Sequence, residues 1–408
     1  MNKAVKVTTI AVMAIVVTIV LANLVPAAGS VATRVKMEDL SFYQAPATTA
    51  PYPLAGGKEV RNVILCIGDG MGTGQIALAS MKAGGKLHME RMPVTGLVQT
   101  RSANSRVTDS AAASTALAAG IKTNNRMIGI APNGQAYRSI LELAKTAGMA
   151  TGLVATSTIT HATPAAFGSH VKSRSSENAI AEQLLANRVN VLFGGGRKFF
   201  LPKSESGSAR KDKRDLIAEA RQAGYAYVTN EQELRSSRRP CVLGLFQLDE
   251  LTTAPPEPSL GTLTREAIRT LSQAGQASPK GSSGFFLMVE GSQIDWACHD
   301  HDTKRAIRQL LLFDQAVQAA IEFALQDEHT LVIVTADHET GGLTLASDRD
   351  RDPEKRVHWS TRGQTGSPVP ISALGPGATM FAGVQDNTDI PSKIAQLLNI
   401  RPFPQPAK

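Results

Sequence analysis

Cysteines and aromatic residues are scarce in this sequence. Its 408 residues include three cysteines, Cys66, Cys241 and Cys298, and 5% are Phe, Trp or Tyr. Three cysteines cannot all pair with one another, so they define no disulfide framework. They also show no CxxC spacing, which excludes a zinc ribbon.

The chain also lacks low-complexity composition and shows no gathering of one charge into a stripe. Hydrophobic residues make up 42% and charged residues 19%, so the chain can bury a full core, and disordered or collagen-like structure is excluded for its bulk. Lys and Arg number 43 against 35 Asp and Glu, a net charge of +8, but the two signs are interspersed. With so few aromatic residues, nucleic-acid binding gains no support. A basic solvated surface is the simpler interpretation.

The N-terminus is the first informative segment. Lys3 and Lys6 precede an uncharged apolar stretch, 7–25, and small residues follow at 27–32. A charged region, an apolar core and a small-residue cleavage zone are typical of a signal peptide. The stretch is also long enough to cross a bilayer. Residues 1–30 are therefore interpreted as a signal peptide or an N-terminal membrane anchor, with cleavage favoured, and both alternatives predict an exported, periplasmic or extracellular protein.

The rest of the chain divides into a tether and one long domain. Residues 31–57 are rich in Ala, Pro and Thr without apolar periodicity, which indicates a tether. Over residues 58–402, short β-branched runs alternate with helix-like segments. The clearest predicted strands are 60–67, 151–155, 190–193, 285–289 and 330–335, and the clearest helices are 114–119, 139–146, 177–186, 216–222 and 304–325. This alternation predicts an α/β domain with a doubly wound, mostly parallel central sheet and helices on both faces. Residues 202–279 hold a basic run and a Pro-rich loop, so we expect surface excursions there rather than a second core.

Several predicted strands end in a side chain that can bind a ligand. Asp69 follows the first strand, Glu290 ends the FFLMV strand, and Asp337 and His338 follow the LVIVT strand. Open parallel sheets bind ligands beyond the carboxyl ends of their strands, so these side chains are expected to converge in one crevice. A single acid at such a place is usually a helix cap, but three strand ends of this kind together favour a functional site.

Two further patterns point to metal and anion chemistry. Asp295 and His299 are four apart, so on a helix they share one face and can grip one ion, although such a pair alone is more often a solvated salt link. Oxygen and imidazole ligands without thiolate favour zinc, manganese or magnesium, and crowded carboxylates require cations, so more than one metal is expected. Ser110 heads an Ala-rich helix that Gly120 ends. This is a plain helix cap or an anion site. No GxSxG elbow surrounds the serine, so a Ser-His-Asp hydrolase is not indicated.

With these residues in view, the sequence resembles the alkaline phosphatases of the compact bacterial type. The resemblance runs from about Val60 to Pro402 and is specific in its combination of motifs. They are IGDGMG at 67–72, TDSAAASTAL at 108–117, HATPAAF at 161–167, MVEGSQIDWACH at 288–299 and TADHETGG at 335–342. It implies hydrolysis of small phosphomonoesters through a phosphoserine, with inorganic phosphate released. It also implies a homodimer. From composition no nucleic-acid partner is expected, and from the N-terminal pattern membrane contact is expected only through a possible N-terminal anchor.

The resemblance also implies a role for each catalytic residue. Ser110 matches the nucleophile, and Arg174 matches the arginine that clamps two phosphate oxygens, a bidentate task that suits its planar guanidinium. Asp109 orients Arg174.

The metal sites implied by the resemblance are two zinc sites and one magnesium site. The zinc that binds the Ser110 oxygen matches Asp69, Asp337 and His338; the second zinc matches Asp295 and His299; the magnesium matches Asp69, Thr163 and Glu290, with His161 and Trp296 surrounding it. Two cations that hold the attacking and leaving oxygens are expected for phosphoryl transfer.

One position departs from the family pattern. Where the family has histidine in Trp-x-Thr-x-x-His-Thr-Gly, this chain has Gln364. An amide oxygen replaces an imidazole nitrogen, so the second zinc should be held less tightly or replaced by a harder ion.

Two alternatives stay open. A sulfatase or phosphodiesterase of the same superfamily is disfavoured, because Ser110 is not followed by the Pro and Arg of a sulfatase motif. The other alternative is a phosphate-binding or weakly active homologue, in which Gln364 impairs one zinc site.

Overall fold

The computed structural model of the protein describes residues 37–54, 57–276, 284–346 and 353–407. The predicted signal peptide or anchor, residues 1–30, lies outside these residues. Within the described residues, no helix is both long and apolar enough to span a membrane.

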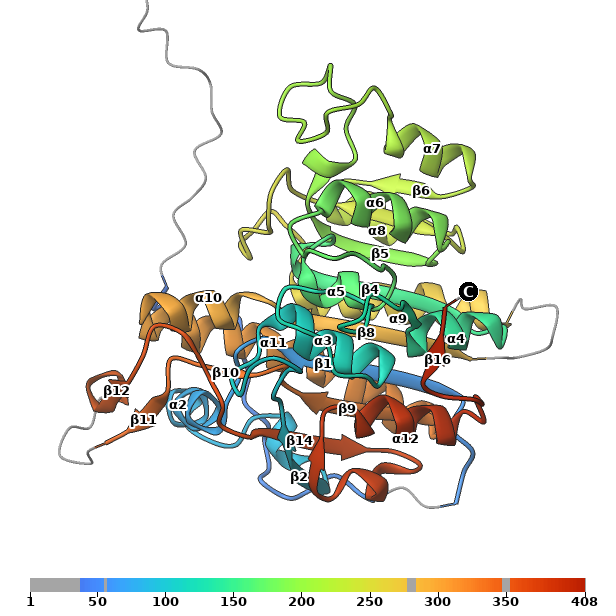
Figure 1. The fold of residues 1–408 in the computed structure, drawn as a ribbon. Coiled ribbons are helices and arrows are strands. Elements are labelled where there is room, and N and C mark those ends of the chain that lie inside the picture. Colours follow the sequence, from blue (N-terminus) through green and yellow to red (C-terminus); the bar gives the residue numbers. More distant parts are fainter. Residues whose placement is uncertain (1–36, 55–56, 277–283, 347–352, 408) are drawn as a thin grey trace, which may run out of the picture. The chain divides into compact units, whose positions relative to one another are not determined.

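A ten-stranded sheet forms the centre of the protein (Figure 1). Its strands are β1 (Asn62–Gly68), β2 (Val94–Gln99), β4 (Ala150–Thr158), β5 (Val191–Gly195), β6 (Ala226–Val228), β7 (Val242–Leu245), β8 (Phe285–Gly291), β9 (Thr330–Thr335), β14 (Val369–Leu374) and β15 (Gly383–Asp386). They lie side by side in the order β15-β2-β14-β9-β1-β8-β4-β5-β7-β6. Among the strands that the structure describes, β14 alone runs antiparallel to its neighbours in this sheet.

The central strands carry the core of the protein. Every residue of β1, β4, β8 and β9 is buried, and these strands pair in parallel. A strand covered on both faces needs a continuous apolar run rather than an alternating one, as in Val63–Ile67. The predicted doubly wound α/β fold is confirmed.

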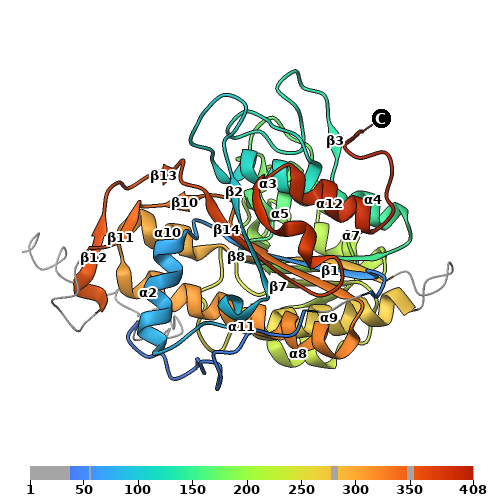
Figure 2. The ribbon, with the colours of Figure 1, turned by 90° about the horizontal axis from the view of Figure 1, so that it is seen from below.

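Helices cover both faces of the sheet. They are α2 (Thr73–Ala83), α3 (Ser110–Ala119), α4 (Ile140–Thr146), α5 (Ala162–Ala166), α6 (Glu177–Ala186), α7 (Leu216–Gln222), α8 (Glu231–Ser236), α9 (Leu260–Gln276), α10 (Gln293–Asp300), α11 (Thr303–Asp327) and α12 (Asp389–Leu397). Figure 2 shows α3, α4, α5 and α12 on one face and α9 and α11 on the other. The helix predicted at 304–325 is α11, and those predicted at 177–186 and 216–222 have the bounds of α6 and α7.

Small elements complete the fold outside the large sheet. Three short antiparallel pairs form: β10 (Glu339–Thr340) with β13 (Gln364–Thr365), β11 (Leu343–Leu345) with β12 (Val357–Trp359), and β3 (Tyr137–Arg138) with β16 (Gln405–Pro406). One-turn 3-10 helices occupy Met89–Arg91, Arg197–Phe199, Pro353–Arg356 and Ala378–Phe381. The first pair places a segment that follows β9 next to one about two dozen residues further along, and it contributes to the site described below.

The prediction of surface excursions over residues 202–279 is wrong for the strands and the long helix of this region, and its other half, the absence of a second core, agrees with the described residues. The described part of this region contains β6 and β7, which extend the large sheet at one edge, and α9, which packs on β4 and β8. Short strands such as AYV and VLGL give too little pattern for recognition from sequence alone. The region adds to the same sheet instead of forming a second core.

The described part of the N-terminal segment, residues 37–54, contacts the sheet domain. Tyr43 donates its hydroxyl to the buried carboxylate of Asp314 on α11, at 2.6 Å between Oη and Oδ2. The backbone N–H of Tyr52 donates to the carbonyl of Arg91 at 2.8 Å.

Candidate active site

The carboxyl ends of β1 and β9 bring three predicted residues together. The two strands are adjacent and parallel, with Ile67 opposite Thr335, so the residues that follow them emerge at the same edge. Nε2 of His338 lies 3.2 Å from Oδ2 of Asp337 and 3.5 Å from Oδ1 of Asp69. All three side chains are fully buried. We call Asp69, Asp337 and His338 the inner group.

Glu290, at the end of β8, lies on the next strand of the sheet. Ligand atoms of Asp69, Glu290 and His161 all lie within 4.8 Å of one another. One oxygen of Glu290 accepts a hydrogen bond of 2.7 Å from the Ser292 hydroxyl. Thr163 is buried in α5, which begins directly after His161.

Asp295 and His299 lie on one face of α10, as their spacing predicts. Nε2 of His299 is 3.3 Å from Oδ1 of Asp295, and Nε2 of Gln364 on β13 is 3.3 Å from the same imidazole nitrogen. A half-turn of the Gln364 amide would bring its oxygen to that place. Nδ1 of His299 donates to the backbone carbonyl of Arg362, which leaves Nε2 to face the carboxylate. We call Asp295, His299 and Gln364 the outer group.

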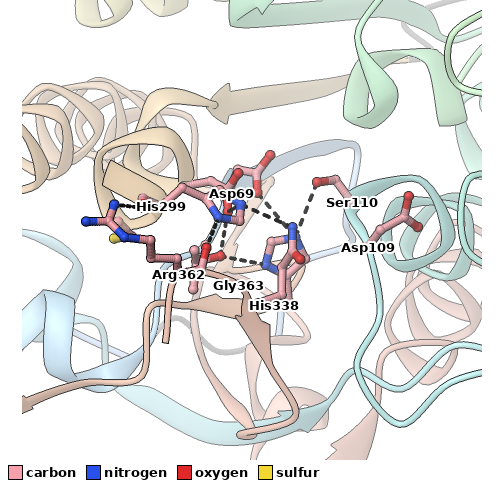
Figure 3. A network of polar contacts seen from close by, with 12 residues as sticks. Asp69, Asp109, Ser110, His299, His338, Arg362 and Gly363 are labelled. Atoms are coloured by element: carbon pink, nitrogen blue, oxygen red, sulfur yellow. Dashed lines mark hydrogen bonds and ion pairs between the residues drawn. The ribbon is translucent and has the colours of Figure 1, made fainter. Parts of the chain in front are cut away.

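Ser110 approaches the inner group from the opposite direction to His299 (Figure 3). It is the first residue of α3, and Asp109 caps the helix by accepting from the N–H of Ala112 at 3.0 Å. The serine Oγ lies 3.2 Å from Nε2 of His338, a contact that the sequence analysis does not predict. The free N–H groups and dipole of a helix N-terminus favour an anion beside this hydroxyl.

Arg174 is held beside the serine by two groups. Its guanidinium donates to Oδ2 of Asp109 at 3.2 Å and to Nε2 of His161 at 3.0 Å. A neutral imidazole that accepts at Nε2 carries its proton on Nδ1, and Nδ1 of His161 has no hydrogen-bond partner among the described residues. The ring of Trp296 meets that of His161 edge to face, with centroids 5.9 Å apart.

Burial and crowding shift the pKa values of these groups. Burial, followed by the charges of Asp337 and Asp295, raises the pKa of Asp69 well above its usual range. Burial raises the pKa of Glu290 to about 7. It lowers that of His161 to about 3, with Arg174 adding to the effect. Four acids and few cations thus share one crevice.

The pKa values of the outer group shift in the direction that favours the charged forms. The hydrogen bond with Asp295 raises the pKa of His299 to about 9. Burial opposes ionisation of Asp295, but its bonds with His299 outweigh burial and lower its pKa. The imidazole is therefore protonated at neutral pH and must release a proton before it can bind a metal.

The donor set fits divalent cations. Several buried oxygens have no hydrogen-bond partner among the described residues, and they are both carboxylate oxygens of Asp69, Oε1 of Glu290, Oδ2 of Asp337 and Oγ1 of Thr163. Buried polar atoms normally have partners, and like charges at this spacing repel, so a cation is the group that satisfies both conditions. Ligand atoms of Asp69, Asp295 and His338 also lie within 4.8 Å of one another.

All the candidate residues that the sequence analysis names meet in this crevice, and some contributors were missed. Thr340 and the carbonyl of Arg362 contact the two ligand-type histidines, and Ser292 contacts Glu290. A single threonine or serine in a sequence does not reveal such a contact, and neither does a backbone carbonyl, which every residue has. Thr340 and Ser292 had a signal, because they belong to the TADHETGG and MVEGSQIDWACH segments.

Comparisons with known proteins agree with this geometry. The alkaline phosphatase family model matches residues 60–351. Alkaline phosphatase 4 of Bacillus subtilis is 38% identical over an alignment that covers 83% of this chain and 89% of the relative. Streptomycin-6-phosphate phosphatase of Streptomyces griseus is 34% identical and covers 89% and 96% of the two chains. The solved structure of alkaline phosphatase from the Antarctic bacterium TAB5 is 35% identical, with a TM-score of 0.75 over 85% of this chain and 100% of that one.

The match spans more than half of the chain, and the relatives are covered nearly end to end. The chain is a phosphatase that belongs to the alkaline phosphatase family.

Proposed function

We propose that the protein hydrolyses phosphomonoesters through a phosphoserine at Ser110, with metal ions held by the inner and outer groups and at Glu290. The observation that carries the proposal is the place of the Ser110 hydroxyl. It sits at a helix N-terminus, 3.2 Å from His338 and beside buried carboxylate oxygens without partners.

The reaction divides into two displacements at phosphorus. Ser110 Oγ loses its proton to solvent and forms a bond to phosphorus as the bond to the leaving oxygen breaks, and the leaving alkoxide takes a proton from water. A water oxygen then bonds to phosphorus as the phosphorus–Oγ bond breaks, which releases inorganic phosphate, and Oγ regains a proton from the attacking water. Bound cations supply charge stabilisation to the attacking and leaving oxygens.

Arg174 binds the phosphoryl group throughout. Its two amino groups are preorganised by Asp109 and by the neutral His161, so the guanidinium loses little freedom when it binds a dianion. Asp109 is in turn fixed by backbone N–H donors, among them that of Arg126 at 3.0 Å.

The metals follow the chemistry of each donor set. Asp69, Asp337 and His338 would hold zinc, while Asp69, Thr163 and Glu290 offer the oxygen ligands that magnesium prefers. A variant of the TAB5 enzyme is known with magnesium bound. The outer group would hold a second zinc through Asp295 and His299, weakly, because Gln364 adds an amide.

Phosphate labelling tests the nucleophile. Radioactive phosphate at low pH should label the wild type on serine and should not label Ser110→Ala. Ser114→Ala is the matched control, since Ser114 is buried one turn further along α3. Equal labelling of Ser110→Ala and the wild type would refute the assignment.

A second candidate function is phosphate binding with weak or no turnover. Gln364 favours it, because the outer group then lacks a second nitrogen ligand. Turnover of a simple aryl phosphate, measured together with metal content, separates the two.

We also propose that the protein is exported and forms a homodimer. Bacterial alkaline phosphatases, which are typically exported, are among the relatives, and residues 1–30 have the pattern of a signal peptide or anchor. Cell fractionation and sedimentation of the purified chain test these two points.

A further inference from the structure

The hydroxyl of Thr340 lies between one residue of the inner group and one of the outer group. It donates to Oδ1 of Asp295, and its oxygen is 3.2 Å from Nδ1 of His338. The side chain is fully buried. Thr340 thus touches both groups without belonging to either.

Counting protons fixes the direction of these two hydrogen bonds. A threonine hydroxyl has one proton, and an ionised carboxylate can only accept, so that proton is committed to Asp295. The hydroxyl oxygen must then accept from His338, which places the imidazole proton on Nδ1. The other tautomer would set two acceptors against each other.

A proton on Nδ1 makes Nε2 the atom of His338 that can bind a cation. Nε2 is the atom that faces Ser110 Oγ at 3.2 Å and the carboxylates of Asp337 and Asp69 at 3.2 and 3.5 Å. The lone pair of the imidazole is therefore aimed at the place where a cation satisfies the inner group.

The backbone holds Thr340 in place from both sides. Its N–H donates to the carbonyl of Gly70 at 3.2 Å, and its own carbonyl accepts from Nε2 of Gln75 at 2.7 Å. It pairs with Gln364 across the β10–β13 ladder. Gly70 has φ +75°, and a Cβ there would come within 3.0 Å of the Thr340 hydroxyl, so glycine permits this close approach.

We propose that Thr340 is a positioning residue that couples the inner and outer groups. Through one hydroxyl it sets the tautomer of His338 and orients the carboxylate of Asp295. The inference deepens the proposed function and rests on its metal sites. Loss of the hydroxyl should weaken both groups together, whereas loss of a ligand should weaken chiefly its own group.

The test compares Thr340→Val and Thr340→Ala, which lack the hydroxyl, with Thr340→Ser, which keeps it. Thr344→Val is the matched control, because Thr344 is exposed on the nearby strand β11. Two quantities are measured on the full chain: the ¹⁵N shifts of the histidine rings without metal, and zinc affinity at each site by chelator competition.

Without the hydroxyl, Nδ1 of His338 should lose its proton at least in part, and zinc affinity should fall by about tenfold or more at both groups, the usual cost of removing a partner of a metal ligand. Thr340→Ser should restore both readings, and Thr344→Val should change neither. An unchanged tautomer in Thr340→Val and Thr340→Ala, or a loss of affinity confined to one group, would overturn the proposal.

The two readings separate this inference from the proposed function. If Ser110 is never phosphorylated but the tautomer and both affinities still follow the hydroxyl, the phosphoserine fails and the role of Thr340 stands. If phosphoserine forms but neither the tautomer nor the zinc affinities respond to the hydroxyl, the phosphoserine stands and the role of Thr340 fails.

Discussion

The inner and outer groups differ in how the fold holds them. The inner group follows two neighbouring strands at the centre of the sheet, and its side chains are fully buried. The outer group joins a helix to a two-residue strand pair, and the side chain of His299 is 32% exposed. One group is part of the core, and the other lies at its margin.

This difference indicates which part of the site tolerates amino-acid substitution. A buried carboxylate without a partner destabilises the fold unless a cation binds, so a metal ion at the inner group should stabilise the folded protein. His299 has partners in Asp295 and Arg362 without any metal. The one departure from the family pattern, Gln364, falls in the outer group.

The largest effect is expected from Asp69→Asn in the inner group. Activity should fall by at least about 10³-fold, because the inner metal site beside the serine and the site at Glu290 lose a shared ligand. The metal-free protein should become more stable by about 1–3 kcal/mol, because a buried charge without a partner is removed. Asp300→Asn, at an exposed carboxylate on α10, should change neither quantity.

The sign of that stability change depends on pH. Since the pKa of Asp69 is raised in the folded chain, the folded state binds more protons than the unfolded one and loses stability as pH rises. The advantage of Asp69→Asn in urea unfolding should grow toward alkaline pH and vanish in acid. If Asp69→Asn stabilises the protein most in acid, the inner group does not hold an unpaired buried carboxylate.

Arg174→Ala should have the next largest effect. Losing charge-assisted bonds to the phosphate dianion should weaken phosphate inhibition by about 1.5–3 kcal/mol. Bound metal should be unchanged, because Arg174 belongs to neither group. An unaltered inhibition constant for inorganic phosphate would rule out the clamp.

A smaller effect is expected from Gln364→His, which adds a nitrogen ligand to the outer group. Zinc affinity there should rise by about tenfold, and less added metal should be needed for half-maximal rate. The wild type should be partly empty at this group or carry another divalent ion. Competitive titration of both proteins measures this, and two tightly bound zinc ions in the wild type would contradict it.

The inner group was the easier part of the site to predict, and the reason is physical. A buried central strand needs a continuous apolar run, and the polar residue that ends it stands out, as Asp69 and Asp337 do. The rule for parallel sheets then brings them together. For the outer group, Gln364 was found through the family motif, since no local pattern joins β13 to α10.

The edges of the fold were harder to predict for a similar reason. The strands β6 and β7 are short, and they belong to the sheet only because β7 pairs with β5 and β6 pairs with β7. Thr340 and the Arg362 carbonyl act through contacts between segments far apart in sequence. Such contacts leave no periodicity to read.

The smallest effect concerns a pair that matches Asp295 and His299 in chemistry but lies outside both groups. His170 donates from Nδ1 to the carbonyl of Gly129 at 2.9 Å, and its Nε2 lies 3.2 Å from Oε1 of Glu142. Burial opposes the charge on each side chain, yet their mutual bond raises the pKa of His170 and lowers that of Glu142, with Arg138 as the opposing charge nearby.

This pair should stabilise the protein most between the ordinary pKa values of its members, 4.5 and 6.5. The raised pKa of His170 makes its contribution disappear as pH rises through the folded value, and the lowered pKa of Glu142 makes its own disappear in acid. Glu142→Gln should therefore cost about 0.5–1 kcal/mol in that window and less on either side. Urea unfolding across pH measures the loss. Adding zinc should leave the pH dependence of this stability loss unchanged, because two acceptors already hold the His170 ring, whereas zinc should displace the proton of His299. If zinc changes the effect of Glu142→Gln, the distinction between a metal-binding pair and a structural pair fails.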